Sequence, residues 1–111
     1  MNAAISPTVL TAAEVEAVPG ARLGTIEGVL NHVLWSDSEA TSGWLIVRAG
    51  HHLGAHHHRE HAHHMWVLEG HAEILDTMLA SGSYVHIPAG VVHDIDARAT
   101  EGCKVYYLYV H

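Results

Sequence analysis

Residues 50–70, GHHLGAHHHREHAHHMWVLEG, carry eight of the thirteen histidines of the chain and lead directly into an apolar run. The cluster lies in mid-chain and other residue types interrupt it, which distinguishes it from a purification tag. Side chains two apart on a β-strand share a face, so His56 and His58 are predicted to lie side by side. After a four-residue connection the chain can reverse as a hairpin, which would bring His63 opposite this pair.

The strand that follows the cluster alternates in a way that predicts its inner face. Met65 and Val67 share the parity of His63 and are expected to line the interior, whereas the residues between them are expected to point outward. Gly70 is expected to end this strand. His61 or His64 would replace His63 beside the pair only if the hairpin had a different register.

A second stretch, residues 82–93, reads GSYVHIPAGVVH and predicts a strand, a Pro/Gly turn and a further strand that carries His93 near its start. Similar short β-prone runs occupy 26–35, 43–49, 63–68, 71–75, 83–87, 91–95 and 104–110. No window past residue 20 has the length and period of a substantial helix. The expected fold is therefore all-β, a small antiparallel barrel or jelly roll.

With 111 residues the chain has room for one domain. Residues 1–24 are expected to hold little regular structure, apart from one helical turn at Thr11, where Thr11 and Glu14 have capping-box spacing. Residues 25–111 are expected to form the barrel. The one cysteine, Cys103, has no partner for a disulfide or a metal pair, and it is interpreted as a small packed residue.

Composition excludes several classes of function. A net charge of −7, with 12 acidic and 5 basic residues, provides no basic surface for a phosphate backbone, so no nucleic-acid partner is expected. The sequence has no run long enough to span a membrane, and its N-terminus lacks the features of a signal peptide. A cytoplasmic location is therefore expected.

The two histidine segments together resemble the cupin superfamily. Its first motif is a glycine, five residues, His-x-His, three or four residues, a glutamate, six residues and a glycine, and it corresponds to Gly50, His56, His58, His63 and Gly70. Its second motif is a glycine, five residues, Pro-x-Gly, two residues, a histidine, three residues and an asparagine, and it corresponds to Gly82, Pro88, Gly90 and His93. The resemblance covers roughly residues 44–110 and implies the double-stranded β-helix of that superfamily.

The sequence departs from these motifs in two positions. His63 stands where the motif has a glutamate, and Ala97 stands where it has an asparagine. The segment between the motifs, residues 71–81, is short and implies a tight hairpin. The closing segment, residues 101–109, is similar to the last strand of cupins related to anti-sigma factors and to diketone-cleaving dioxygenases.

The resemblance implies one divalent transition-metal ion per chain, held by His56, His58, His63 and His93. Four nitrogen ligands without a thiolate suit Fe, Mn, Ni, Cu or Zn, and the sequence does not select among them. Carboxylates that orient the ligand rings are expected among Glu60, Asp94 and Asp96. The remaining histidines are interpreted as solvated or interface residues, except His86, for which a role near the pocket is equally expected.

The resemblance leaves three functions open. The first is a metal-dependent oxygenase that acts on a small organic molecule with chelating oxygen atoms. The second is a redox-neutral metalloenzyme, such as an isomerase or a cyclase, and the third is a non-catalytic sensor of a small molecule or a metal. Small cupins commonly pair through their sheets, so a homodimer with outward Trp66 and Leu68 as apolar anchors is also expected.

Overall fold

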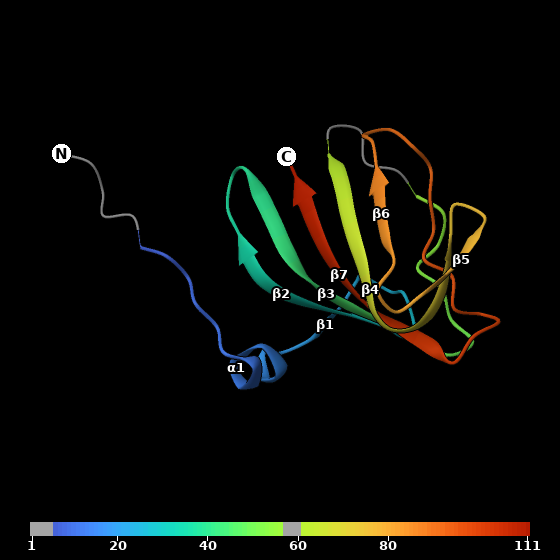
Figure 1. Cartoon of the computed structure of the whole chain (residues 1–111), viewed down its shortest axis with the longest axis horizontal. Helices are drawn as coiled ribbons and strands as arrows, with labels where there is room; N and C mark the ends of the chain where they lie inside the picture. The colour runs from blue at the N-terminus through green and yellow to red at the C-terminus, as the bar shows by residue number, and fades with distance from the viewer. Residues whose placement is uncertain (1–5, 57–60) are drawn as a thin grey trace.

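The computed structural model describes residues 6–56 and 61–111, and its strands pair in antiparallel fashion. Its elements are α1 (Ala12–Ala17), β1 (Ala21–Arg22), β2 (Val29–Ser36), β3 (Ala40–Arg48), β4 (Ala62–Ile74), β5 (Thr77–Ala80), β6 (Tyr84–Ile87) and β7 (Gly102–Val110). The strands follow the order β1-β2-β3-β7-β4-β5, and β6 pairs with β4 (Figure 1). The predicted all-β antiparallel fold is therefore confirmed.

β4 is the longest strand and takes part in two sheets (Figure 1). The prediction that Gly70 ends this strand is wrong, because β4 runs on to Ile74. The strand contains the whole of the expected run 63–68 and all of the expected run 71–75 except residue 75. The register shifts between Val67 and Glu69, and Gly70 has a φ of 73°. A Cβ at Gly70 would lie 2.0 Å from the carbonyl oxygen of Gly102, so this glycine allows a bulge in a strand that continues.

The tight hairpin expected in residues 71–81 is confirmed. β4 and β5 are joined by Leu75 and Asp76, whose φ angles of 49° and 62° are those of a two-residue hairpin turn. The prediction of a strand over 91–95 is wrong, because this segment forms only isolated β-bridges. His93 pairs there with His56, and Asp96 just beyond it pairs with His52 and Glu73.

The concave face of the sheet is buried, and its residues alternate as expected. Met65 and Val67 are each 2% exposed, whereas Leu68 is 45% exposed. On β7, Tyr107 is buried and Tyr106 lies on the other face. The largest fully buried side chains are Ile74, Ile87, Ile95, Val29, Val47 and Val105. Cys103 belongs to this core, which confirms its interpretation as a packed residue.

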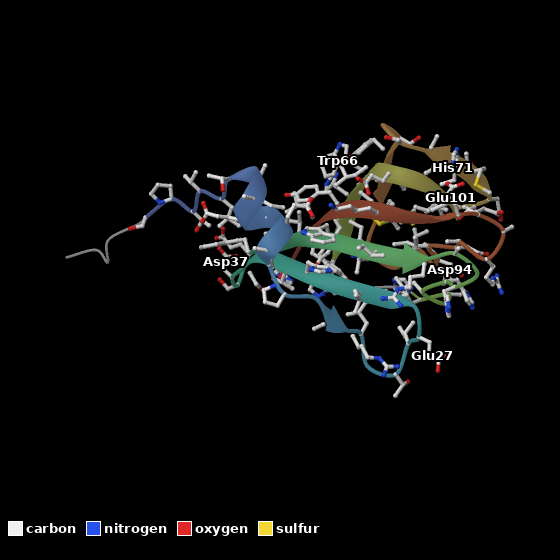
Figure 2. The ribbon with its side chains drawn as sticks, turned by 90° about the horizontal axis from the view of Figure 1, so that it is seen from below. Glu27, Asp37, Trp66, His71, Asp94 and Glu101 are labelled. Carbon is white, nitrogen blue, oxygen red and sulfur yellow. The ribbon has the colours of Figure 1, made fainter. Side chains whose placement is uncertain are left out.

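The outer face of the sheet carries aromatic side chains. Trp66, labelled in Figure 2, lies on this face with its ring centroid 5.1 Å from that of Tyr84 and 5.6 Å from that of Tyr106. Leu68 is exposed on the same strand. Both residues therefore stand where the expected homodimer would need them, and the homodimer itself stays a prediction.

The segment before β2 packs against the sheet. The capping box expected at Thr11 is confirmed, since the Thr11 hydroxyl accepts the Glu14 N–H and the Glu14 carboxylate accepts the Thr11 N–H. His32 Nδ1 donates to the carbonyl of Val18 over 2.8 Å, and its ring stacks on Trp44 with 3.6 Å between centroids. Among the described residues, no helix is long and apolar enough to cross a membrane.

Candidate metal centre

A cavity of about 430 Å³ opens on the concave face of the sheet. Three of the predicted ligands, His56, His63 and His93, line it. The remaining lining is mostly apolar and consists of Leu23, Ile26, Asn31, Leu45, Leu53, Gly54, Ala55, Met65, Ile95, Tyr107 and Tyr109. The cavity therefore combines a group of imidazoles with a largely apolar chamber, as small-molecule sites do.

The three imidazoles face one cavity, although His93 comes from a part of the chain distant from the other two. His56 and His93 form a reciprocal backbone bridge, with both N–H···O distances at 2.8 Å, and their ring centroids lie 4.2 Å apart. The ring centroid of His63 lies 5.2 Å from that of His93. His56 was expected to face His63 across a hairpin, but its bridge partner is His93. His58 lies outside the described residues.

Backbone carbonyls orient two of these rings. His56 Nδ1 donates to the carbonyl of Gly54 over 2.7 Å, and His93 Nδ1 donates to the carbonyl of Val91 over 3.0 Å. In a neutral imidazole with its proton on Nδ1, Nε2 carries the lone pair. Metal-binding histidines in proteins are held in this way by a hydrogen bond from the other ring nitrogen. The arrangement of His56 and His93 therefore fits a metal ion bound through Nε2.

The carboxylate of Asp94 supports this arrangement one step further from the cavity. Its Oδ1 accepts the backbone N–H of Gly54 at 2.8 Å, and its Oδ2 bonds to Nδ1 of His52 at 2.8 Å. Gly54 has a φ of 103°, a conformation that favours glycine. Asp94 thus fixes the position of Gly54, and the carbonyl of Gly54 orients the ring of His56.

Asp96, also expected to orient a ligand ring, does not do so. Its carboxylate accepts hydrogen bonds from Arg98, and these bonds hold the pKa of Asp96 at about 2. Glu60, the third carboxylate expected near the site, lies outside the described residues. Of the two acids that the structure describes, Asp94 is therefore the one connected to a candidate ligand.

His63 is buried between two strands. It is 5% exposed, and the sheet register places it opposite Tyr109 of β7 and Ile87 of β6. Its ring centroid lies 3.7 Å from that of Tyr109. Burial raises the pKa of Tyr109 to about 12, so its phenol stays protonated at neutral pH. Burial also lowers the pKa of His93, which favours the neutral imidazole that a metal requires.

The other described histidines lie away from the candidate ligands or serve other contacts. His71 Nδ1 bonds to Glu101, and Figure 2 shows this pair together on one side of the molecule. His64 bonds to Tyr84 on the outer face. His86 stacks on His64 and is exposed, so of the two roles left open for it the structure favours the surface role. Within residues 6–56 and 61–111, no three His, Cys, Asp or Glu side chains form a group that could hold a metal ion.

The sequence analysis did not identify Asn31, a polar residue of the cavity lining. Asn31 lies on β2, and its Oδ1 accepts a hydrogen bond of 2.7 Å from the hydroxyl of Tyr107. Tyr107 and Tyr109 are two apart on β7 and so share a face, and both line the cavity. Asn31 could not be recognised from the sequence, because its hydrogen-bond partner Tyr107 lies 76 positions further along the chain.

Comparisons with known proteins agree with this architecture. No protein-family model and no curated protein matches the sequence. Among solved structures, an RmlC-like cupin from Shewanella frigidimarina matches with a TM-score of 0.79 and 18% identity, over 95% of this chain and 91% of that chain. A predicted oxalate decarboxylase from Thermotoga maritima matches with a TM-score of 0.74 and 15% identity, over 86% of this chain and 95% of that chain.

A third match is a chain of the Rhodobacter sphaeroides complex between SigE and the anti-sigma ChrR. Its TM-score is 0.70 at 22% identity, and the match covers 84% of this chain and 49% of that chain. These identities are low, and what the matched structures share with this chain is the arrangement of the strands. The chain therefore has the cupin fold, the double-stranded β-helix that its two histidine motifs predict.

Proposed function

We propose that this chain binds one divalent transition-metal ion on His56, His58, His63 and His93 and acts on a small, largely apolar molecule that chelates the metal through oxygen atoms. One observation carries the proposal. His56 and His93 line an apolar cavity, and each ring is oriented by an Nδ1–H···O bond to a backbone carbonyl. This orientation turns two metal-binding nitrogens toward the same chamber.

The charge of the proposed site follows from its ligands. Four neutral imidazoles leave the full +2 charge of a divalent ion, whereas a glutamate at position 63 would reduce it to +1. A bound ion would supply Lewis acidity and attract an anionic oxygen ligand such as an enolate or a phenolate. His63 is thus the residue that distinguishes this site from one with the usual cupin glutamate.

The residues around the imidazoles define what the chamber accepts. Met65, Leu45 and Ile95 present apolar surface to the ligand, and they exclude water from it once it is bound. Tyr109 lies against His63 and keeps its proton, because burial raises its pKa to about 12. The chamber therefore favours a neutral or singly anionic molecule with an apolar body.

The reaction that we propose is oxygen-dependent cleavage of such a molecule. Dioxygen is the oxidant, and both of its atoms are retained in the products of the cleaved bond. A 1,3-diketone or a catechol meets the two requirements of the chamber, since each combines a pair of chelating oxygens with an apolar body. An isomerase, a cyclase or a sensor would use the same ligands but consume no oxygen.

Two measurements test the proposal in sequence. Protein reconstituted separately with Fe, Mn, Ni, Cu and Zn is analysed for metal content, and about one ion per chain is expected for at least one metal. His71→Ala is the control for loss of a histidine outside the site, and it should bind as much metal as the wild type, because His71 pairs with Glu101 away from the cavity. Oxygen uptake by the ferrous protein is then measured with 1,3-diketones and catechols. Absence of bound metal in all five preparations would refute the metal site, and metal binding without oxygen uptake would refute the oxygenase.

A further inference from the structure

We infer that the molecule bound in this cavity carries a hydrogen-bond acceptor remote from its chelating oxygens, and that Asn31 recognises this acceptor. The inference rests on the proposed function and narrows its substrate class. The acceptor is a neutral carbonyl or ether oxygen, because the group that faces it is the N–H of an uncharged amide. Asn31 would then be a specificity-determining residue.

Asn31 and His63 belong to different sides of one cavity. Asn31 is on β2 and His63 is on β4, with β3 and β7 between them in the sheet. Neighbouring strands are about 4.8 Å apart, so three strand spacings separate the two residues along the curved sheet. A ligand that touches both must therefore extend across the chamber.

The side chain of Asn31 is held in one orientation. The Tyr107 hydroxyl donates to Asn31 Oδ1 at 2.7 Å, and Tyr107 is 4% exposed. Tyr107 reaches Asn31 by crossing Gly43 of β3, where an added Cβ would lie 2.9 Å from the tyrosine hydroxyl oxygen. Because this bond uses Oδ1, the amide nitrogen Nδ2 is the group of Asn31 that remains to serve a ligand.

The surroundings of Asn31 explain why a ligand acceptor is needed. Within the described residues, Asn31 Nδ2 makes no hydrogen bond, and the nearby cavity lining from Leu23, Ile26 and Leu45 offers only apolar side chains. In the open cavity Asn31 is partly exposed, so solvent water can reach its amide N–H. A ligand that displaces this water without providing an acceptor leaves the N–H unsatisfied, which is unfavourable. The cavity thus discriminates between two ligands of equal shape by one oxygen atom.

The test compares two chelating probes that differ at the far end alone. Each is 1-phenylbutane-1,3-dione, with either an acetyl group or an isopropenyl group of the same shape in the para position of the ring. Dissociation constants are measured with the zinc-loaded protein, which supports no oxidation, for the wild type and for Asn31→Leu. The ratio of the two constants in the wild type, divided by the same ratio in the variant, cancels the electronic effect of the acetyl group on the diketone.

We expect the wild type to favour the acetyl probe by about three- to tenfold more than Asn31→Leu does, the value of one hydrogen bond. Asn31→Asp keeps the size of the side chain and removes the donor, so it should lose the preference as well. Tyr107→Phe should lose part of it, because Asn31 is then no longer oriented.

Two negative results are distinguishable: one refutes the role of Asn31 alone, and the other refutes the proposed function as well. If the preference for the acetyl probe is the same in the wild type, Asn31→Leu and Asn31→Asp while both probes bind in a zinc-dependent way, Asn31 is not the recognition residue and the metal proposal stands. If neither probe binds the zinc-loaded protein better than the metal-free protein, the proposed function fails, and this inference fails with it.

Discussion

His63 and His64 are neighbours on β4 and lie on opposite faces of it, where each belongs to a different group of histidines. His63 faces the cavity and approaches His93 and Tyr109. His64, the next residue, faces outward, where its Nδ1 and the Tyr84 hydroxyl lie 2.6 Å apart and its ring stacks on His86. Consecutive residues of a strand point to opposite faces, so one position of register separates a candidate ligand from a surface residue.

The inner and outer groups also differ in how their rings are held. The rings of His56 and His93 donate to backbone carbonyls, which are fixed by the fold. The ring of His64 bonds to the side chain of an exposed tyrosine. A ring held by backbone loses little further freedom when it binds a metal, which is why the inner group is the better candidate.

Alanine substitutions should separate the two groups most strongly. His93→Ala removes a ring that contacts both His56 and His63, and we expect metal affinity to fall by at least about a hundredfold. His86→Ala on the outer face should leave affinity unchanged. Metal content after dialysis against a competing chelator measures both. Equal losses in the two variants would show that the metal does not distinguish the inner group from the outer one.

The pH dependence of metal binding gives the next largest effect. A histidine ring of ordinary pKa, about 6.5, loses roughly tenfold in availability when the pH falls to 5.5, because a proton occupies the nitrogen that the metal needs. The lowered pKa of His93 moves this competition to a lower pH for that ring.

We therefore expect affinity to fall steeply between pH 7.5 and 5.5, by at least about a hundredfold in total. Titrations with a competing chelator at each pH measure the slope, and His64→Ala should reproduce the wild-type curve. A flat profile would mean that carboxylates rather than imidazoles provide the ligands.

A third test of the difference between the inner and outer histidines concerns the hydrogen bond between Asp94 and Gly54, which supports the ring of His56. Asp94→Ala removes the acceptor for the Gly54 N–H and should reduce metal affinity by about ten- to a hundredfold, as losses of such supporting bonds do. Asp94→Asn keeps an oxygen acceptor and should recover most of the affinity. Asp96→Asn is the control, since Asp96 binds Arg98 instead. If the control is as damaging as Asp94→Ala, Asp94 has no specific role.

The smallest expected effect concerns His63 itself. His63→Glu restores the residue type of the usual cupin motif, so metal binding should persist, with a change of about tenfold in favour of manganese over zinc. His64→Glu changes the same charge on the other face and should leave the preference as it was. Competition between the two metals, followed by elemental analysis, decides it. A loss of all binding in His63→Glu would contradict the proposed ligand position.

Local sequence pattern was sufficient for several features of the fold. The alternation of residues 63–68 predicted which side chains of β4 face the core, the short 71–81 segment predicted the β4–β5 hairpin, and Thr11 with Glu14 predicted the helix cap. Gly70 was misinterpreted because a glycine that ends a strand and one that allows a bulge look alike in sequence. Only the proximity of the Gly102 carbonyl distinguishes the two cases.

The sequence by itself determined the all-β class and the inward parity of His63, because both depend on spacing between residues close along the chain. The candidate ligand set followed instead from the resemblance of the two histidine segments to the cupin motifs. The tertiary structure decided which groups hold these residues. The Asp94–Gly54 bond joins residues 40 positions apart, and the Tyr107–Asn31 bond joins residues 76 positions apart. Such contacts depend on the register of the whole sheet, and that register results from the packing of all its strands rather than from any one segment.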